Sequence, residues 1–342
     1  MPRDRRTRPT RTTPPVPTLA DVARIARVST ATISRALNKP QAVSVATRLR
    51  VQQAIDASGY VPNLLAGGLA SSRSRLVAAL VPAIATSMFN QTIESMALAL
   101  ASAGYLVVLG LTGYEEHGAA GTVDALLARR PDALILTRSP TEPQIRRRLR
   151  ASGVTIIETW DLPPRPLDVA IGFSHERAGR ALADFVLERG YRRPLLITHG
   201  LARGRTRMQG FMARFRERGL RAPFCDLCEA LPFAIDGRAR LGMFLDAGRR
   251  ADVVVCSSDS LAQEVMMEAL ARGLSVPGDL GVIGFGANEP VLATALPLTT
   301  VRIDGAEIGR RAAQVLLMRS QGREPPQRRI DVGFEILARS SA

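Results

Sequence analysis

The 342-residue chain has only three cysteines, no long apolar run and no apolar signal sequence at its start. Three cysteines are too few for a disulfide framework, so we expect a reducing compartment. Cys225 and Cys228 form a CxxC pair, but no second pair follows and no histidine has ligand spacing, so we expect no metal or other cofactor. No apolar stretch approaches the roughly 20 residues that cross a bilayer, which indicates a cytoplasmic protein.

Motifs of the common enzyme classes are also absent. The chain has no Walker loop, no GxSxG elbow and no HExxH sequence. The stretch GFGANE at 284–289 lacks the third glycine of a dinucleotide-binding loop, and Ser258 and Asp259 have no histidine beside them in the sequence. We therefore expect no enzymatic activity.

Positive charge is present and is concentrated at the N-terminus. The formal net charge is +15, and residues 1–75 carry thirteen arginine or lysine residues against three aspartates. These residues hold +10 of the charge, which leaves +5 for the other 267. Such a distribution favours a polyanionic partner, with nucleic acid the first candidate, and the alternative is a solvated basic surface. Residues 1–17, rich in Arg, Thr and Pro, should form a disordered arm.

Three short amphipathic helices are predicted between residues 18 and 59, capped by Thr18, Ser29 and Ser44. The inward apolar positions are Leu19, Val22, Ala23 and Ala26 in the first helix and Ile33, Ala36 and Leu37 in the second. The outward positions of the second helix are Thr30, Ala31, Ser34 and Arg35. A short turn between the first two helices matches a helix-turn-helix unit, whose second helix enters the DNA major groove. Arg35 could there donate two hydrogen bonds to a guanine edge, although a surface helix of a small bundle would have a similar pattern.

The stretch TLADVARIARVSTATISRALN at 18–38 and its continuation at 43–74 resemble the N-terminus of the LacI/GalR family of transcriptional repressors, and the resemblance continues to the C-terminus. It implies a DNA-binding domain at 18–61, a hinge at 62–75 and a two-lobed effector-binding and dimerisation domain at 76–342. Arg27 departs from the family pattern, which has glycine at this turn. An arginine there must accept a positive φ, at about 1 kcal/mol, or shift the turn.

The resemblance implies that the hinge folds into a helix on operator DNA, where Leu69 wedges into the minor groove beside Ala66. Gly67 and Gly68 each cost about 1 kcal/mol in a helix relative to alanine, so the segment should stay unfolded until DNA orders it. A plain flexible linker is the alternative. The expected DNA-contacting residues are Thr18, Ser29, Thr30, Ala31, Thr32, Ser34, Arg35, Asn38, Tyr60, Asn63, Ala66 and Leu69.

From residue 76 onward the sequence alternates short apolar stretches with amphipathic segments. This alternation predicts an α/β fold of parallel sheets covered on both faces, and nine strands suit two doubly wound halves. The expected strands are 76–82, 105–111, 132–137, 154–159, 169–173, 194–199, 252–257, 281–285 and 298–303. Ligands of such folds bind beyond the carboxyl ends of the strands.

Residues that follow these strands are therefore candidates for binding a small effector. Arg207 is the strongest, because a guanidinium can hold a carboxylate or two hydroxyls; the alternative is a solvated surface position. The family resemblance, to two-lobed periplasmic sugar-binding proteins, also implies cleft positions for Phe89, Thr137, Phe173 and Ser258. The single tryptophan, Trp160, could stack on a sugar or simply pack in the core. The candidate set is Met88, Phe89, Thr137, Trp160, Phe173, Arg203, Arg207, Ser258, Asp259 and Gly286.

The stretches IETWDL, IGFSHERAG, VIGFG and IDVGFEILARSS resemble the gluconate-repressor branch of the family. Sugar binders of the family usually have an aspartate after VIGF, whereas Gly286 and Ala287 follow here, which favours an anionic effector. The resemblance implies a repressor of sugar-acid utilisation genes, bound to operator DNA as a homodimer and released by gluconate or a related sugar acid. The tail lacks a leucine-heptad extension, which favours a dimer over a tetramer. The alternatives are a co-repressor-type regulator of another carbohydrate and a cytoplasmic sugar-binding protein. A transport binding protein would share the two-lobed fold, but it would need an export signal and no basic head.

Overall fold

The computed structural model describes residues 17–61, 73–84, 87–114, 119–228, 235–287 and 297–342. The chain divides between Ser74 and Arg75 into two compact units, called here the head and the body. Nearly all of the arm expected at 1–17, and residues 62–72 of the expected hinge, lie outside the described residues.

The head contains the three predicted helices: α1 (Leu19–Ala26), α2 (Thr30–Asn38) and α3 (Val45–Ser58), with a 3-10 turn at Pro40–Ala42 between the last two. Each of the three helices begins after its predicted cap, whose side-chain oxygen accepts a hydrogen bond from the backbone N–H three residues on. Helix α3 ends at Gly59, which has φ 66°. The sequence-based helix prediction is therefore confirmed.

The small core of the head is formed mainly by Val22, Ala26, Ile33, Val51 and Ala54. The prediction that Leu37 faces inward was wrong, because this residue is 36% exposed. Leu37 lies in the last turn of α2. Because three short helices form only a small core, Ile33 and Ala36 are the residues of α2 that are buried in it. The predicted outward positions of α2 are all exposed.

The turn between α1 and α2 contains Arg27, which adopts φ 53° and ψ 47°. Of the two alternatives for this arginine, the chain therefore takes the left-handed conformation and keeps the turn. The Arg27 N–H still donates to the carbonyl of Ala23, which closes the end of α1.

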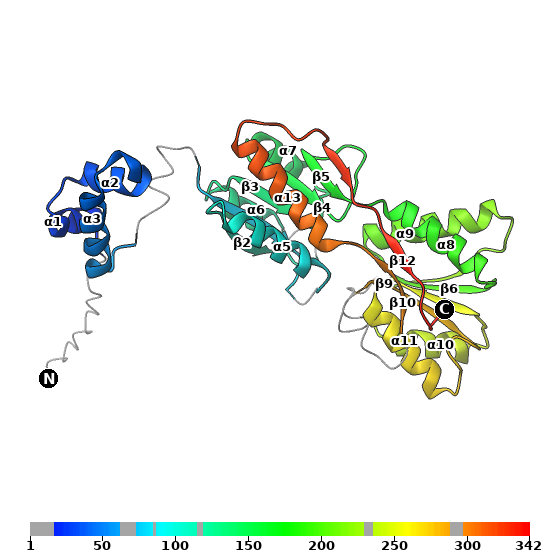
Figure 1. The fold of residues 1–342 in the computed structure, drawn as a ribbon. Helices are drawn as coiled ribbons and strands as arrows, with labels where there is room; N and C mark the ends of the chain where they lie inside the picture. The colour runs from blue at the N-terminus through cyan, green and yellow to red at the C-terminus, as the bar shows by residue number, and fades with distance from the viewer. Residues whose placement is uncertain (1–16, 62–72, 85–86, 115–118, 229–234, 288–296) are drawn as a thin grey trace, which may run out of the picture. The chain divides into compact units, whose positions relative to one another are not determined.

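The body contains two six-stranded sheets, which define a first lobe and a second lobe (Figure 1). In the first lobe the strand order is β11-β5-β4-β3-β1-β2, and in the second it is β12-β10-β9-β8-β6-β7. All neighbouring strands are parallel except β10 and β12, which pair antiparallel. The predicted α/β class with two parallel-sheet lobes is confirmed.

The first lobe is built mainly from residues 76–172. Its strands are β1 (Leu76–Val81), β2 (Leu106–Leu111), β3 (Ala133–Leu136), β4 (Thr155–Thr159), β5 (Val169–Gly172) and β11 (Arg329–Asp331). Helices α5 (Asn90–Ala101) and α13 (Gly305–Ser320) pack on one face of the sheet, and α6 (Ala119–Leu127) and α7 (Pro143–Ala151) pack on the other. Successive residues of each strand point to opposite faces of the sheet. In β1, for example, Val77 packs on the side of α5 and α13, and Ala78 packs on the side of α6 and α7.

The second lobe repeats this arrangement. Its strands are β6 (Pro194–His199), β7 (Phe224–Cys228), β8 (Val253–Cys256), β9 (Gly281–Gly286), β10 (Thr299–Arg302) and β12 (Glu335–Leu337). Helices α8 (His175–Glu188) and α9 (Ala202–Glu217) cover one face, and α10 (Gly237–Asp246) and α11 (Asp259–Ala271) cover the other. The sequence predicted nine of these twelve strands and missed β7, β11 and β12.

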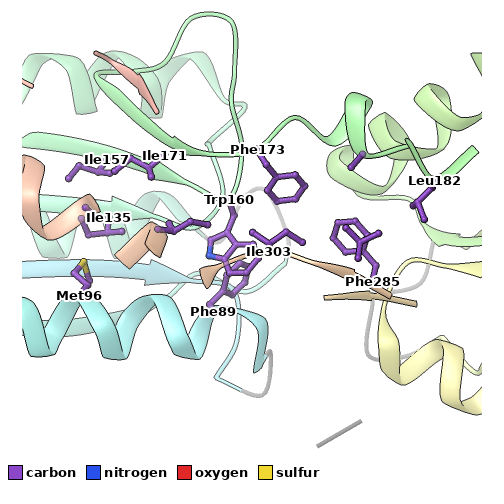
Figure 2. Close-up of a cluster of buried hydrophobic side chains, with 14 of the residues drawn as sticks. Phe89, Met96, Ile135, Ile157, Trp160, Ile171, Phe173, Leu182, Phe285 and Ile303 are labelled. Atoms are coloured by element: carbon purple, nitrogen blue, oxygen red, sulfur yellow. The ribbon is translucent and has the colours of Figure 1, made fainter. Parts of the chain in front are cut away.

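The chain passes between the lobes three times: after β5, between β10 and α13, and between β11 and β12 (Figure 1). Side chains near these crossings join the cores of the two lobes into one apolar cluster. Figure 2 shows Trp160, Phe89 and Ile303 at the centre of this cluster, with Ile135 and Ile157 on one side and Phe285 and Leu182 on the other. The two lobes therefore share one apolar core where they meet.

Candidate functional site

The exposed surface of α2 carries the residues expected to read DNA. Thr30, Ala31, Ser34 and Arg35 are exposed, and Thr32 is partly buried. The Ser29 hydroxyl accepts a hydrogen bond from the Thr32 N–H at 3.1 Å, and the Asn38 side chain donates to the Ser34 carbonyl at 3.0 Å. Short side chains at these positions leave the helix backbone close to any partner on this face, which suits a helix that lies in a groove.

Thr18 and Tyr60 lie at the two ends of the head. Thr18 caps α1 through a reciprocal pair of bonds with Asp21, whose hydrogen bonds from Thr18 lower the pKa of its carboxyl. Tyr60 is half-buried against the head core. The other expected DNA-contacting residues, Asn63, Ala66 and Leu69, lie outside the described residues.

The body contains a cavity of about 400 Å³ lined by both lobes. Pro82, Thr112 and Thr137 reach it from the ends of β1, β2 and β3 in the first lobe, and Gly200 and Ser257 reach it from the ends of β6 and β8 in the second. The cavity thus lies beyond the carboxyl ends of both sets of strands, where ligands of doubly wound folds bind. Six members of the candidate set line it: Met88, Phe89, Thr137, Arg203, Arg207 and Ser258.

Arg207 is the most deeply placed cation of this cavity, with 9% of its surface exposed. Its guanidinium lies over the Phe285 ring at 3.9 Å and donates to the Ser257 carbonyl at 3.3 Å. In the described part of the chain, no carboxylate lies within ion-pair distance of it. Burial, and secondarily the neighbouring charge of Arg203, lowers the pKa of Arg207 to about 9, so it remains a cation at neutral pH.

Arg203 lies one turn before Arg207 on α9. It donates to the Thr159 carbonyl at 2.9 Å, and its Nε is 3.7 Å from the Asp161 carboxylate. Arg138 also lines the cavity and donates to the Tyr114 carbonyl at 2.8 Å. Among the described residues of the lining, the three guanidiniums are accompanied by two carboxylates, those of Asp161 and Glu142, so this part of the lining carries a net positive charge.

Two histidines that the sequence analysis did not predict as site residues also line the cavity. They are His175, which is 3% exposed, and His199. Burial is the main cause that lowers the pKa of His175 well below its usual value and the pKa of His199 to about 4. Both rings are therefore neutral at neutral pH. The charge of Arg207 acts in the same direction on both. Each histidine lies at or just after a strand end or crossing, which is the positional signal that could have identified it.

Four members of the candidate set do not line the cavity: Trp160, Phe173, Asp259 and Gly286. Trp160 and Phe173 are buried in the apolar cluster between the lobes, although Trp160 packs edge-on against Phe89, which does line the cavity (Figure 2). Asp259 is fully buried and accepts a hydrogen bond from Thr300. Core packing thus accounts for the position of Trp160.

Among the residues that the structure describes, no cluster of three or more His, Cys, Asp or Glu side chains could hold a metal ion. The helices in the same part of the chain are each too short or too polar to cross a membrane.

Known proteins share both parts of this architecture. Residues 18–63 match the model for bacterial regulatory proteins of the lacI family, and residues 183–342 match a periplasmic binding protein-like domain. The HTH-type transcriptional regulator GntR of Pseudomonas aeruginosa is 35% identical over 315 residues, which cover 92% of each chain.

Solved structures agree over nearly the whole chain. A LacI-family regulator from Silicibacter pomeroyi is 29% identical with a TM-score of 0.88, over 95% of this chain and 99% of that one. The lac repressor dimer bound to operator and the anti-inducer ONPF is 25% identical with a TM-score of 0.83, over 96% and 99% of the two chains. The chain therefore belongs to the LacI family of bacterial regulatory proteins, which are DNA-binding transcriptional regulators and not enzymes.

Proposed function

We propose that this regulator is a cytoplasmic homodimer that represses genes of sugar-acid utilisation and leaves its operator when a sugar acid of the gluconate type binds in the body. The observation that carries the proposal is Arg207, a buried guanidinium that faces a cavity of about 400 Å³ without a carboxylate partner among the described residues. A buried cation without a counter-ion is costly, and the carboxylate of a bound sugar acid would remove that cost.

The rest of the cavity supports an anionic polyol as ligand. Arg138 and Arg203 add positive charge, while Thr137, Ser139 and Ser258 supply hydroxyl groups. The buried Ser139 Oγ and His199 Nδ1 have no hydrogen-bond partner within the described residues. Because buried polar groups are normally paired, these two atoms need a partner that the described residues do not supply. The resemblance to the gluconate-repressor branch points to the same chemistry.

In the head, the exposed face of α2 would read the operator. Arg35 would contact a base edge in the major groove, and the N-terminal ends of α1 and α2, capped by Thr18 and Ser29, would lie near phosphates. Asn63, Ala66 and Leu69 would add contacts from the hinge. Two heads of a dimer would then read two half-sites of an approximate palindrome.

The test is an Arg207→Ala variant. Its control is Arg218→Ala, which removes an exposed arginine at the C-terminal end of the same helix, α9. D-gluconate should bind the wild-type chain and the Arg218→Ala control, and should release both from operator DNA in a gel shift. Arg207→Ala should keep operator binding and lose at least about tenfold in D-gluconate affinity, the equivalent of about 1.4 kcal/mol. Equal D-gluconate affinity of Arg207→Ala and the wild type by calorimetry would contradict the assignment.

The same gel shift decides the sense of regulation. If D-gluconate strengthened operator binding, the protein would be of the co-repressor type. If another carbohydrate of a calorimetry panel bound and D-gluconate did not, the sugar-acid proposal would be wrong.

A further inference from the structure

Helices α8 and α9 approach each other unusually closely beside the cavity. A Cβ built on Gly179 of α8 would meet the Arg207 carbonyl oxygen at 1.9 Å, and one built on Gly210 of α9 would meet the Glu176 carbonyl oxygen at 2.3 Å. Each glycine therefore lets its helix lie directly against the backbone of the other. This packing brings His175, the first residue of α8, to the Arg207 side chain.

His175 forms two hydrogen bonds that use both ring nitrogens. Its Nδ1 lies 3.1 Å from Nη1 of Arg207, and its Nε2 lies 3.0 Å from the Trp160 carbonyl oxygen. A guanidinium can only donate, so Nδ1 must be the acceptor and must carry no proton. A carbonyl can only accept, so Nε2 must carry the proton. The two contacts together require the neutral ring with its proton on Nε2.

The chain of contacts continues from Trp160 to the first lobe. The indole Nε1 of Trp160 donates to the Thr92 hydroxyl at 2.9 Å, and that hydroxyl donates to the Gly305 carbonyl at 2.8 Å. His175 follows the first crossing between the lobes, and Gly305 follows the second. Two sets of hydrogen bonds, joined through the backbone and side chain of Trp160, thus connect Arg207, in the cavity wall of the second lobe, to two of the three crossings.

We propose that His175 is a positioning residue of the effector site, which holds the Arg207 guanidinium toward the cavity and links its position, through the Trp160 carbonyl, to the segments that cross between the lobes. This inference rests on the proposed function, in which the effector binds Arg207. If effector binding moves Arg207, His175 would move with it. That displacement would reach the segments that cross between the lobes and would change the orientation of one lobe relative to the other.

A neutral imidazole suits this position for an electrostatic reason. An aspartate or glutamate could also orient Arg207, but it would neutralise the guanidinium and compete with an anionic effector. The imidazole accepts a hydrogen bond and leaves the positive charge for the ligand. Burial and the charges of Arg207 and Arg203 keep the ring neutral, in agreement with the tautomer that the geometry requires.

The first experiment needs no effector. The wild-type chain has three histidines, so ¹⁵N-histidine NMR of the full-length protein is simple to assign with a His175→Phe variant. The His175 ring should show a bare Nδ1 and a protonated Nε2, unchanged from about pH 6 to about pH 8. In Arg207→Ala the Nδ1 resonance should shift. A proton on Nδ1, a charged ring near neutral pH, or no response to Arg207→Ala would overturn the proposal.

The second experiment separates the two hydrogen bonds. In His175→Asn, the amide oxygen can replace Nδ1 and still accept from Arg207, but the donor to Trp160 is lost. In His175→Gln, the amide nitrogen can replace Nε2 and still donate to Trp160, but Arg207 loses its acceptor. Glu176→Gln, at the exposed next position, is the matched control.

We expect His175→Asn to bind D-gluconate within about threefold of the wild type and yet to lose most of the D-gluconate-induced change in operator affinity and Trp160 fluorescence. We expect His175→Gln to lose about tenfold or more in D-gluconate affinity. A merely structural histidine would affect both quantities equally in both variants, and that result, or wild-type behaviour of both, would overturn the proposal. Failure of the wild-type chain to bind D-gluconate would instead contradict the proposed function, while the NMR experiment would still decide the role of His175.

Discussion

Arg27 occupies a left-handed backbone conformation that glycine adopts at little cost. Because a Cβ in this region is strained, Arg27→Gly should stabilise the head by about 1 kcal/mol. Arg24→Gly, within α1, should destabilise the head by about 1 kcal/mol or slightly more, because glycine adds backbone entropy to the unfolded chain and the exposed ion pair with Asp21 is lost. Calorimetric unfolding of the full-length variants measures both changes. Destabilisation by Arg27→Gly would show that the arginine side chain makes a stabilising contact that outweighs the backbone strain.

The two cavity histidines predict a pH dependence of the stability of the body. The pKa of His199 is about 4 in the folded chain and that of His175 also lies well below the ordinary 6.5, so the unfolded chain binds more protons below pH 6.5. The contribution of the neutral rings is thus complete above about pH 6.5 and is lost as the pH falls toward about 4.

His199→Gln should flatten this decline, because glutamine does not titrate. Urea unfolding followed by Trp160 fluorescence at several pH values measures the slope. An unchanged slope between about pH 6.5 and about pH 4.5 would contradict the folded-state pKa of His199. Below that range the carboxyl of Glu217, whose pKa is lowered to about 2 by hydrogen bonds from Arg180 and Arg214, adds a second loss.

Residue by residue, the sequence predicted the candidate site unevenly. Arg207, Thr137 and Ser258 could be found because they follow predicted strands, and strand ends gather at one edge of a parallel sheet. His175 also follows a predicted strand, so its position could have been found in the same way, but its role could not. It depends on contacts with Trp160 and Arg207, which are 15 and 32 residues away along the chain, and those contacts arise only from the packing of α8 on α9.

Among the elements, α8 and α9 form the most sensitive pair. Gly179→Ala places a methyl group against the Arg207 backbone and should destabilise the body by roughly 1 to 3 kcal/mol, because the two helices must separate. Gly121→Ala in α6, where a Cβ would meet nothing within 4 Å, should stabilise the body by up to about 1 kcal/mol, because alanine favours a helix more than glycine does.

Chemical unfolding of both glycine variants gives the comparison. Gly179→Ala should also weaken D-gluconate binding, since separation of the helices moves Arg207 away from the cavity. If both substitutions had the same sign, close approach would not be the reason for glycine at position 179.

The three strands that the sequence did not predict all lie at sheet edges. β11 and β12 have three residues each, with charged residues at one or both ends, and they are edge strands. β7 is longer, but it is also an edge strand, is largely exposed and has Asp226 at its centre. Edge strands need no continuous apolar run, so apolar patterning detected the buried central strands and, at a sheet edge, only β2, whose sequence LVVLGL has no polar residue.

At the scale of the whole molecule, effector and operator should be linked thermodynamically. If D-gluconate lowers operator affinity by a given factor, operator DNA must lower D-gluconate affinity by the same factor. Fluorescence titration of the full-length chain, with and without saturating operator, measures one side of the cycle, and gel shifts measure the other. Unequal factors would show that a further state or species takes part in the equilibrium.

The path of the chain has a consequence for how such a regulator can change over evolutionary time. The head is one continuous stretch, so a single genetic junction near residue 74 can replace it whole and give the protein a different target on the chromosome. Each lobe of the body is assembled from separated stretches, because the chain crosses three times, so no single junction can transplant one lobe. One recombination event can therefore pair the existing body with a new head, or the existing head with a new body, whereas a gradual change of the effector within one body requires point substitutions around the cavity.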